Sequence, residues 1–581
     1  MRYIFLILIL MLIADVSEAG INKLDPILRP LLLDDKDKYL CAPSQVLQFR
    51  DDSYSEPTIN TIIRVSGDSA SLRRTGAKIR SVVDDLITAD VPVNSLKKLI
   101  ELPNVLYIQS ARKLEICKES DTMLDKSVPD TSANQVWNGK PNYTGRDVLV
   151  AVIDTGIDWK HPAFMGADGK TRILYIWDQT IHNNRKFPIG FMYGTEWTKA
   201  DIDSGICTEI DSASHGTHVA STIAGDERKS NGFTGMAPEA NLIIIKSNFY
   251  DADVIDAVKY ILNKADILGK PVVINMSFGS NWGPHDGTEY LDQALDRLIN
   301  RPRQAIVASA GNSGGRNIHV GTRALRQSVS NNYQWVAIRP LIGAEFVPME
   351  VWYNPADRLS VRLLIPKNKN GDLSDFDVGW INTGESKSFI IPEGPLKGAE
   401  VLIDASFLAS EFLYPNFNNI YIYLSKNGNL CIPIDDYVFA VEFDGAGVGF
   451  NAYLPYYAIF TKDIPVSAVF PNKSYLMEGD GNYSVISPSS ASKIISVGSY
   501  VSRSEWIDSE NRIRDDGLKI NSISAFSSRG PLINGVLKPE IAGPGKWLLL
   551  VFHLIHGIEQ GIYIKMERML LGMERVCLPL M

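Results

Sequence analysis

The stretch Asp147–Asp158, with the sequence DVLVAVIDTGID, decides the fold class of this chain. Its apolar residues, Val148–Ile153, run without interruption into an aspartate and a glycine turn. A short apolar run bounded by turn residues is typical of a strand buried on both faces of a parallel sheet. Asp154 ends this strand, where an ionised carboxylate is costly unless a donor or a cation pairs with it. Taken alone, Asp154 is better interpreted as a turn-capping residue, because aspartate is common in such turns.

Buried strands recur along the chain, and an amphipathic helix follows one of them. Strands that alternate with helices predict a parallel α/β sheet, in which active sites gather at the carboxyl ends of the strands. The predicted strands lie at 240–248, 271–280 and 304–315, and the helix lies at 252–269. The same pattern resumes at 490–502 and 523–531.

Three other segments depart from this pattern. Residues 60–116 mix short strands with one amphipathic helix, which predicts a small α+β unit. Residues 117–135 are polar and rich in turn residues, so we expect an exposed linker that is easily cut. Residues 334–470 alternate with period two between turns, which predicts a β-rich insert with a sandwich or jelly-roll fold.

Composition limits the classes of function. The net charge of −9 at pH 7 argues against a nucleic-acid partner, because a nucleic-acid-binding protein presents a basic surface. Five scattered cysteines without CxxC spacing predict neither a metal site nor a disulfide framework, although one or two bridges remain open.

The N-terminal residues have the pattern of an export signal. Arg2 supplies a positive start, Tyr3–Ala14 an apolar core, and Ser17 and Ala19 the small residues before a cleavage point. The core is short for a membrane span, and no later stretch reaches about 18 uninterrupted apolar residues. We therefore expect a signal peptide at 1–19, a secreted protein and no stable membrane anchor.

Two further strand-end turns carry chemistry. In SHGTHVASTIAG, Ser214–Gly225, two histidines stand close together, but no cysteine, glutamate or third histidine lies nearby at metal-ligand spacing. The small residues that follow predict a helix that packs closely and holds the His215 ring in place. In ASAGNSGG, Asn312 stands in a glycine turn after a strand, where its amide can donate to a developing oxyanion.

Aspartate, histidine and asparagine in this order point to an acyl-transfer enzyme, and the segments around them resemble the subtilisin-like serine peptidases, or subtilases. The blocks VAVIDTGID, HGTHVASTIAG, VINMSFGS, ASAGNSGG and FSSRGP with LKPEIAGPG span about 145–545, apart from the insert. The resemblance implies an α/β, subtilisin-like three-layer fold with a mostly parallel sheet, an N-terminal α+β pro-domain and a β-rich, jelly-roll-like insert.

The resemblance also assigns roles to residues. It implies that Asp154 orients His215 and stabilises its imidazolium, while His215 acts as general base and then as general acid. His215 matches the catalytic position of the motif, and His218 does not. Asn312 would supply the oxyanion-hole amide. The residues implied to line the substrate cleft are Asn275, Met276, Ser277, Phe278 and Gly279.

Partners and boundaries follow from the same resemblance. Substrates would be proteins or peptides, and the chain's own pro-domain would inhibit the site until it is cleaved. The chemistry needs no cofactor; calcium often binds this family, but no residues here match a ligand set. The implied division is 1–19 signal peptide, 20–118 pro-domain, 119–333 with 471–545 peptidase, 334–470 insert and 546–581 an aberrant tail.

The family's nucleophile, a serine in a Gly-Thr-Ser-Met motif, has no counterpart in this sequence. No serine follows Gly545, and the turn chemistry stops near Trp547. The possible codons of Gly572–Met581 can be read in a frame that begins one base earlier. In this shifted frame the codon that spans Met573 and Glu574 must encode glycine, and the codons around it can encode the sequence WNGTSMSTPH. This string resembles the family's serine block, so we hypothesise a frameshift, in the gene or its sequencing, at about Trp547–Leu550.

Two functions remain open at this point, and a third, a β-domain adhesin that carries an inert α/β module, is disfavoured by the small size of the insert. The first is a secreted subtilisin-type endopeptidase represented by a broken or misread gene. The alternative is an inactive pseudopeptidase with a divergent C-terminus that binds peptides or regulates a partner.

Overall fold

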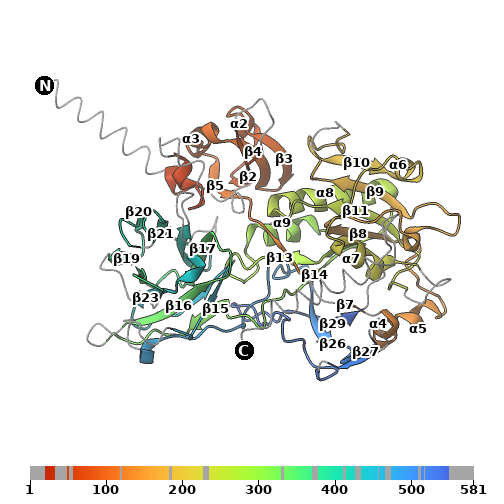
Figure 1. The fold of residues 1–581 in the computed structure, drawn as a ribbon. Helices are drawn as coiled ribbons and strands as arrows, with labels where there is room; N and C mark the ends of the chain where they lie inside the picture. The colour runs from red at the N-terminus through yellow and green to blue at the C-terminus, as the bar shows by residue number, and fades with distance from the viewer. Residues whose placement is uncertain are drawn as a thin grey trace.

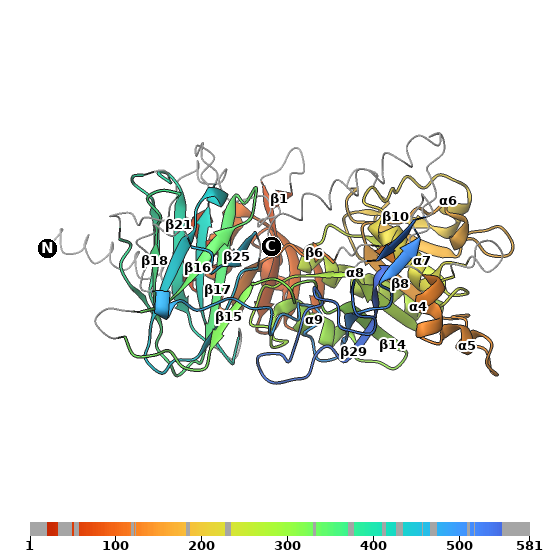
Figure 2. The same cartoon turned by 60° about the horizontal axis from the view of Figure 1, so that its bottom comes forward.

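The computed structural model forms three lobes (Figure 1): an N-terminal unit, a large α/β unit and a β-rich insert. Turning the molecule by 60° shows the insert at one end and the α/β unit at the other (Figure 2). The structure describes residues 20–32, 49–50, 57–117, 121–122, 124–181, 186–226, 234–328, 333–369, 377–394, 396–409, 414–425, 434–455, 457–464, 473–507, 512–515 and 517–548.

A mostly parallel sheet forms the centre of the α/β unit. Among the described residues its strand order is β10-β9-β11-β8-β12-β14-β26-β29-β7, and every neighbouring pair except β10 with β9 is parallel. The strands are β7 (Asp121–Thr122), β8 (Leu149–Asp154), β9 (Ile173–Asp178), β10 (Thr195–Thr198), β11 (Asn241–Lys246), β12 (Val272–Met276), β14 (Gln304–Ser309), β26 (Ile495–Val501) and β29 (Ile541–Leu548). This arrangement confirms the predicted parallel α/β sheet.

Alternate residues of the central strands pack against helices on opposite faces of the sheet, which makes three layers. Ala151 and Ile153 of β8 belong to the apolar core beneath α8 and α9. Val150 and Val152 join the core beneath α7 instead. The helices of this unit are α4 (Leu124–Asp130), α5 (Ala133–Trp137), α6 (Lys199–Asp203), α7 (His215–Ala224), α8 (Asp251–Leu268) and α9 (Tyr290–Leu298), with the 3-10 turn η4 (Pro162–Phe164).

The N-terminal unit is an antiparallel sheet with two short helices. Strand β2 lies beside β4 and β5, and β4 pairs in turn with β3. The elements are η1 (Arg29–Leu32), β1 (Phe49–Arg50), β2 (Thr58–Val65), α2 (Ala70–Arg73), β3 (Lys78–Val83), β4 (Leu86–Pro92), η3 (Val93–Ser95), α3 (Leu96–Ile100) and β5 (Val105–Ser110).

Buried charges join the N-terminal sheet to helix α8 of the α/β unit. Arg80 of β3 contacts Asp253 at 2.6 Å and Asp256 at 3.3 Å, and both carboxylates are fully buried. Thr88 of β4 donates to Asp256 at 2.7 Å. The N-terminal unit is thus a packed partner of the α/β unit.

The insert is a sandwich of two antiparallel sheets around its own apolar core. One sheet has the order β15-β24-β17-β22-β21-β20 and the other β19-β18-β23-β16-β25. Its elements are β15 (His319–Thr322), β16 (Gln334–Pro340), β17 (Phe346–Tyr353), β18 (Ser360–Leu364), β19 (Ile381–Asn382), β20 (Ser386–Ile390), β21 (Glu400–Phe407), β22 (Asn418–Ser425), β23 (Phe439–Asp444), β24 (Phe450–Tyr453) and β25 (Ala458–Phe460), with η5 (Ile434–Asp436) and η6 (Lys473–Tyr475).

Two boundaries differ from the sequence prediction. The insert begins at β15, before residue 334, because the short segment His319–Thr322 pairs with β24 without having an apolar run of its own. The predicted linker at 117–135 contains helix α4, since Leu124 and Val128 stand one turn apart and are both buried.

Some predictions lie partly or wholly outside the described residues. The expected signal peptide at 1–19 lies outside them, as does the tail from residue 549 onward. Strand β29 continues through Leu548, three residues past Gly545, and pairs with β26 and β7. No helix in the part of the chain that the structure describes is long and apolar enough to cross a membrane.

Candidate active site

Asp154 and His215 meet at the carboxyl edge of the central sheet. Asp154 is the last residue of β8, and His215 is the first residue of α7. Their side chains form a hydrogen bond of 2.7 Å between His215 Nδ1 and Asp154 Oδ1. Asp154 is fully buried, whereas the His215 side chain keeps 12% of its surface exposed. A buried carboxylate thus fixes the imidazole through Nδ1 and leaves Nε2 for another partner.

A hydroxyl and carboxylate network holds the start of α7 against the end of β8. Thr155 donates to Asp211 at 2.7 Å and accepts from the amide of Gly216 at 2.9 Å. The second oxygen of Asp211 accepts from the hydroxyl of Thr217 at 2.7 Å. Sequence reasoning missed Asp211 and the two threonines as positioning residues. The available signal was an aspartate four residues before the histidine.

Gly216 explains why a glycine follows the histidine. A Cβ atom at this position would lie 2.2 Å from the backbone carbonyl oxygen of Gly156. Only a residue without a side chain lets the helix approach the turn after β8 this closely. The small residues Ala220 and Ala224 continue the contact further along the helix, and both are fully buried.

The two histidines of this helix differ in their protonation. Burial opposes a charge on His215, but the hydrogen bond to Asp154 and the charge of that carboxylate raise the pKa of His215 above its ordinary value. Burial, together with the charge of His215, lowers the pKa of His218 to about 4. His215 is therefore the group that can take and return a proton near neutral pH.

Asn312 lies in the turn after β14, at the same edge of the sheet. Only β12 separates β14 from β8, and all three strands are parallel. Gly311 supplies a φ of 109°, and Ser528 ties the turn down by donating from its amide to Gly311 and accepting from the amide of Ser313.

The segment Leu114–Cys117 lies beside His215. Strand β6 (Glu115–Ile116) pairs antiparallel with β13 (Phe278–Gly279), and the Cys117 amide donates to the carbonyl of Ser277 at 2.9 Å. His215 Nε2 lies 3.3 Å from the Cys117 carbonyl oxygen. An extended segment of the chain itself therefore lies against His215.

The predicted cleft residues divide into two groups. Ser277 and Gly279 offer backbone to the strand in the cleft. The backbone of Phe278 also pairs with Ile116, while the side chains of Met276 and Phe278 are fully buried in the core beneath α8. This division follows from the alternation of side chains along a strand, which turns every second residue inward. Asn275 donates from its side chain to the Ser277 hydroxyl at 3.0 Å.

The described part of the chain was searched for metal-ligand groups and disulfide bonds. No group of three or more His, Cys, Asp or Glu side chains there could hold a metal ion, so structural calcium stays a prediction. Cys117 and Cys207 form no disulfide.

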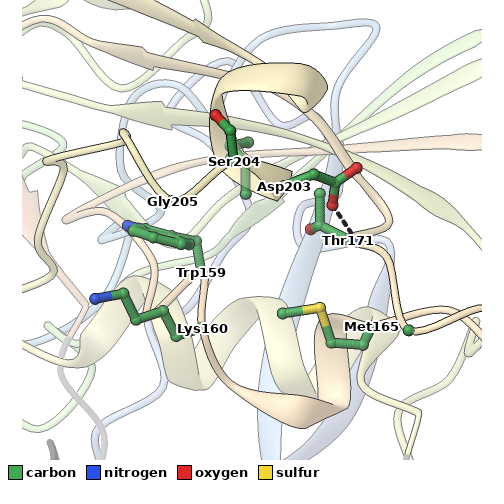
Figure 3. A pocket seen from close by; sticks show the side chains of 9 residues that line it. Trp159, Lys160, Met165, Thr171, Asp203, Ser204 and Gly205 are labelled. Atoms are coloured by element: carbon green, nitrogen blue, oxygen red, sulfur yellow. Dashed lines mark hydrogen bonds between the residues drawn. The ribbon is translucent and has the colours of Figure 1, made fainter.

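A hollow of about 370 Å³ lies away from this chemistry, between η4 and α6 (Figure 3). Trp159 and Lys160 line it, with the Lys160 ammonium 4.8 Å from the Trp159 ring centre. Asp203, on its far side, accepts from the amide of Thr171 at 2.8 Å (Figure 3). Asp154, His215 and Asn312 do not line this hollow.

Comparison with known proteins agrees with this geometry. A family model described as "Subtilase family" matches residues 145–338. An intracellular serine protease of Paenibacillus polymyxa is 35% identical over 199 residues, which cover 33% of this chain and 48% of the relative. Serine protease AprX of Bacillus subtilis is 28% identical over 257 residues, covering 42% of this chain and 49% of the relative.

The minor extracellular protease Vpr of Bacillus subtilis is 25% identical over 331 residues, covering 52% of this chain and 35% of the relative. The chain thus spans about half or less of the length of these curated relatives. Among solved structures, the Clostridium perfringens CspB protease aligns with a TM-score of 0.55 at 21% identity, over 72% of this chain and 80% of that chain. This likeness concerns the fold, and it confirms the predicted subtilisin-like α/β class.

Proposed function

Residues 145–338 form a domain of the subtilase family, a family of serine proteases, and from this premise we propose that the protein is a secreted serine endopeptidase. The observation that carries the proposal is the 2.7 Å hydrogen bond between Asp154 and His215 at the edge of the sheet. A peptide strand lies in the cleft beside the same histidine. A base held by a buried carboxylate beside an extended peptide fits the hydrolysis of amide bonds.

The chemistry follows from the position of each group. Asp154 holds the ring with Nδ1 protonated, so Nε2 is available to take the proton of an attacking hydroxyl. The same nitrogen returns the proton to the leaving amine, and Asp154 stabilises the imidazolium in between. Asn312 would donate to the oxyanion, which contributes about 2.7–4 kcal/mol to the transition state.

The attacking hydroxyl is missing from the chain as written. Residues 546–581 contain no serine, and the codons of Gly572–Met581 permit WNGTSMSTPH when each is read from one base earlier. We therefore place the nucleophile in the shifted frame and call the protein translated through that frame the frame-restored chain. The chain as written would be inactive in acylation.

The N-terminal unit would act as the inhibitor of a zymogen. Its last residues, Leu114–Cys117, lie in the cleft, and its sheet packs on α8 through Arg80. Export is supported by the signal-like residues 1–19, and one relative is an extracellular protease.

A fluorophosphonate probe tests this function, because it labels only an activated serine. We expect labelling of the frame-restored chain and none of the chain as written. His215→Ala in the frame-restored chain is the matched control and should abolish labelling. Labelling of the chain as written would contradict the claim that it lacks a nucleophile. A frame-restored chain that folds but is not labelled would favour the inactive pseudopeptidase.

A further inference from the structure

The turn that carries Asn312 is held at both of its ends by segments outside it. At its start, the amide of Ile486 donates to the carbonyl of Ala310 at 3.1 Å. At its end, the side-chain amide of Asn281 donates to the Ser313 hydroxyl at 3.2 Å. Asn281, Ser313 and Ile486 are all buried. The position of Asn312 therefore depends on where these two segments lie.

The imidazole of His285 lies between the same two segments. His285 is in the loop between β13 and α9, four residues after Asn281, and it is 3% exposed. Its Nδ1 lies 2.8 Å from the carbonyl oxygen of Val485, the residue before Ile486. Its Nε2 lies 3.1 Å from the carbonyl oxygen of Asn281. One ring thus contacts the backbone of both segments that hold the Asn312 turn.

The His285 ring can donate to only one of these carbonyls near neutral pH. Burial lowers the pKa of His285 to about 4, so the ring is neutral and carries a single N–H. The shorter distance assigns this proton to Nδ1, which donates to Val485. Because the ring bonds one segment and only packs against the other, a further contact is needed to fix its position.

Tyr453 of the insert supplies that contact. It is the last residue of β24 and is fully buried. Its ring stacks on the His285 ring, with centres 3.9 Å apart and planes 15° from parallel. The Tyr453 hydroxyl donates to the carbonyl of Tyr483 at 3.2 Å, two residues before Val485. One side chain of the insert therefore contacts both His285 and the segment to which His285 bonds.

The backbone of His285 indicates that its surroundings hold it in place. Its φ is 54°, in the left-handed region that favours glycine, and such a conformation persists where the surrounding structure fixes it. The antiparallel bridge between Ser280 and Ser487 also joins the two segments. The fold of this region therefore does not depend on His285 alone, and variants of His285 should fold.

We propose that His285 is a positioning residue for the Asn312 amide and that Tyr453 of the insert fixes His285 in place. The insert would then contribute to the rate of the reaction without touching the substrate. The proposal rests on the proposed function, because it concerns the oxyanion donor of that same site.

Kinetics of the frame-restored chain with and without Asn312 test this proposal. His285→Asn suits the left-handed backbone but is too short to contact both segments, and Asn281→Ala removes the donor to Ser313. Each should lower kcat by about tenfold and leave KM unchanged, because a misplaced oxyanion donor affects the transition state. In the Asn312→Ala background the same substitutions should lower kcat by less than about twofold, since the amide that they position is gone.

Substitutions at Tyr453 test the part played by the insert. Tyr453→Leu removes the stacked ring and should lower kcat by about tenfold, again only in the chain that keeps Asn312. Tyr453→Phe keeps the ring and should lose less. The matched control is Tyr353→Leu, because Tyr353 is equally buried but belongs to the insert's own core. This control should lower Tm without changing kcat.

The outcomes separate this proposal from the proposed function. Equal losses of kcat with and without Asn312 would make His285 and Tyr453 structural residues only, and would overturn the inference. A raised KM with an unchanged kcat, or no loss of kcat at all, would overturn it too. A folded frame-restored chain that does not react with the fluorophosphonate overturns the function itself.

The chain as written gives a readout that does not depend on catalysis. In protein labelled with ¹⁵N-asparagine, the Asn312 side-chain signal is the one that disappears in Asn312→Ala. His285→Asn and Tyr453→Leu should shift this signal, and Tyr353→Leu should leave it in place. A signal that stays in place in His285→Asn and Tyr453→Leu would contradict the positioning role, whether or not the frame-restored chain is active.

Discussion

Two groups of fully buried carboxylates lie on opposite sides of the same α/β unit, and they are paired differently. Asp154 is paired with His215, an imidazole that can gain or lose its proton near neutral pH. Asp253 and Asp256 are paired with Arg80, whose guanidinium stays charged at every pH a protein survives.

The difference shows what each group can do. The guanidinium of Arg80 keeps its charge, so Arg80, Asp253 and Asp256 can only hold the N-terminal unit against α8. A titratable partner can move a proton, so the Asp154 pair can take part in a reaction. A change at the Asp154 pair should therefore affect the rate of the reaction, and a change at Arg80 should affect the stability of the fold.

The largest effect is expected at Asp154. Asp154→Asn in the frame-restored chain keeps the shape but presents the wrong imidazole tautomer, so kcat should fall by about 10⁴-fold. Steady-state hydrolysis of a peptide substrate measures this, and Tm should change far less than the rate. A loss of less than tenfold would show that Asp154 is only the turn-capping residue.

A smaller effect, on the free energy of unfolding, is expected at Arg80. Arg80→Met leaves buried carboxylates without their cation, which costs about 3–5 kcal/mol. Urea unfolding of the chain as written measures the change in the free energy of unfolding. The matched control is Arg301→Met, because Arg301 pairs with Asp266 at 2.9 Å on the exposed surface, where about 0–1 kcal/mol is expected. Equal losses in the two variants would contradict the role given to Arg80.

Asn312 should show an effect on the rate alone. Asn312→Ala in the frame-restored chain removes one oxyanion donor, so kcat should fall by about 10²–10³-fold while KM stays unchanged. A rise in KM with an unchanged kcat would instead place Asn312 among groups that bind the ground state.

The smallest effect is a shift in titration, and the chain as written can show it by NMR of the histidine rings. His215 should titrate above its ordinary value of about 6.5, and His218 at about 4. Because the folded pKa of His215 is raised, its pairing with Asp154 stabilises the fold below about pH 6.5, and this stability is lost as pH rises through the folded pKa.

The same titration predicts a pH profile for the frame-restored chain. The base must be neutral, so kcat/KM should fall as pH drops through the raised pKa of His215. Asp154→Asn should move this limb to lower pH. If the acidic limb of the kcat/KM profile stays at the same pH in Asp154→Asn, Asp154 does not set the pKa of His215.

Local patterns in the sequence predicted the elements of the α/β unit closely. The apolar run around Asp154 became β8, residues 240–248 became β11, and the helix predicted at 252–269 became α8. Each is fixed by its own periodicity, and parallel order places strand ends at one edge. Strand order alone does not bring His215 to that edge, because His215 begins α7 after a segment without a strand. Its pairing with Asp154 was an expectation from the resemblance to the subtilases.

Long-range pairing could not be predicted in the same way. The strand Glu115–Ile116 is only two residues long, and nothing local specifies that it pairs with Phe278–Gly279. Its position depends on the docking of the whole N-terminal sheet through Arg80 and Asp253.

The nucleotide sequence across codons 540–590 tests the central claim most directly. The account predicts that, beyond about codon 550, the frame that begins one base earlier encodes Gly-Thr-Ser-Met opposite Met573–Cys577. A sequence whose shifted frame lacks Gly-Thr-Ser would contradict the claim that Asp154 and His215 belong to a serine peptidase whose nucleophile was lost by frameshift.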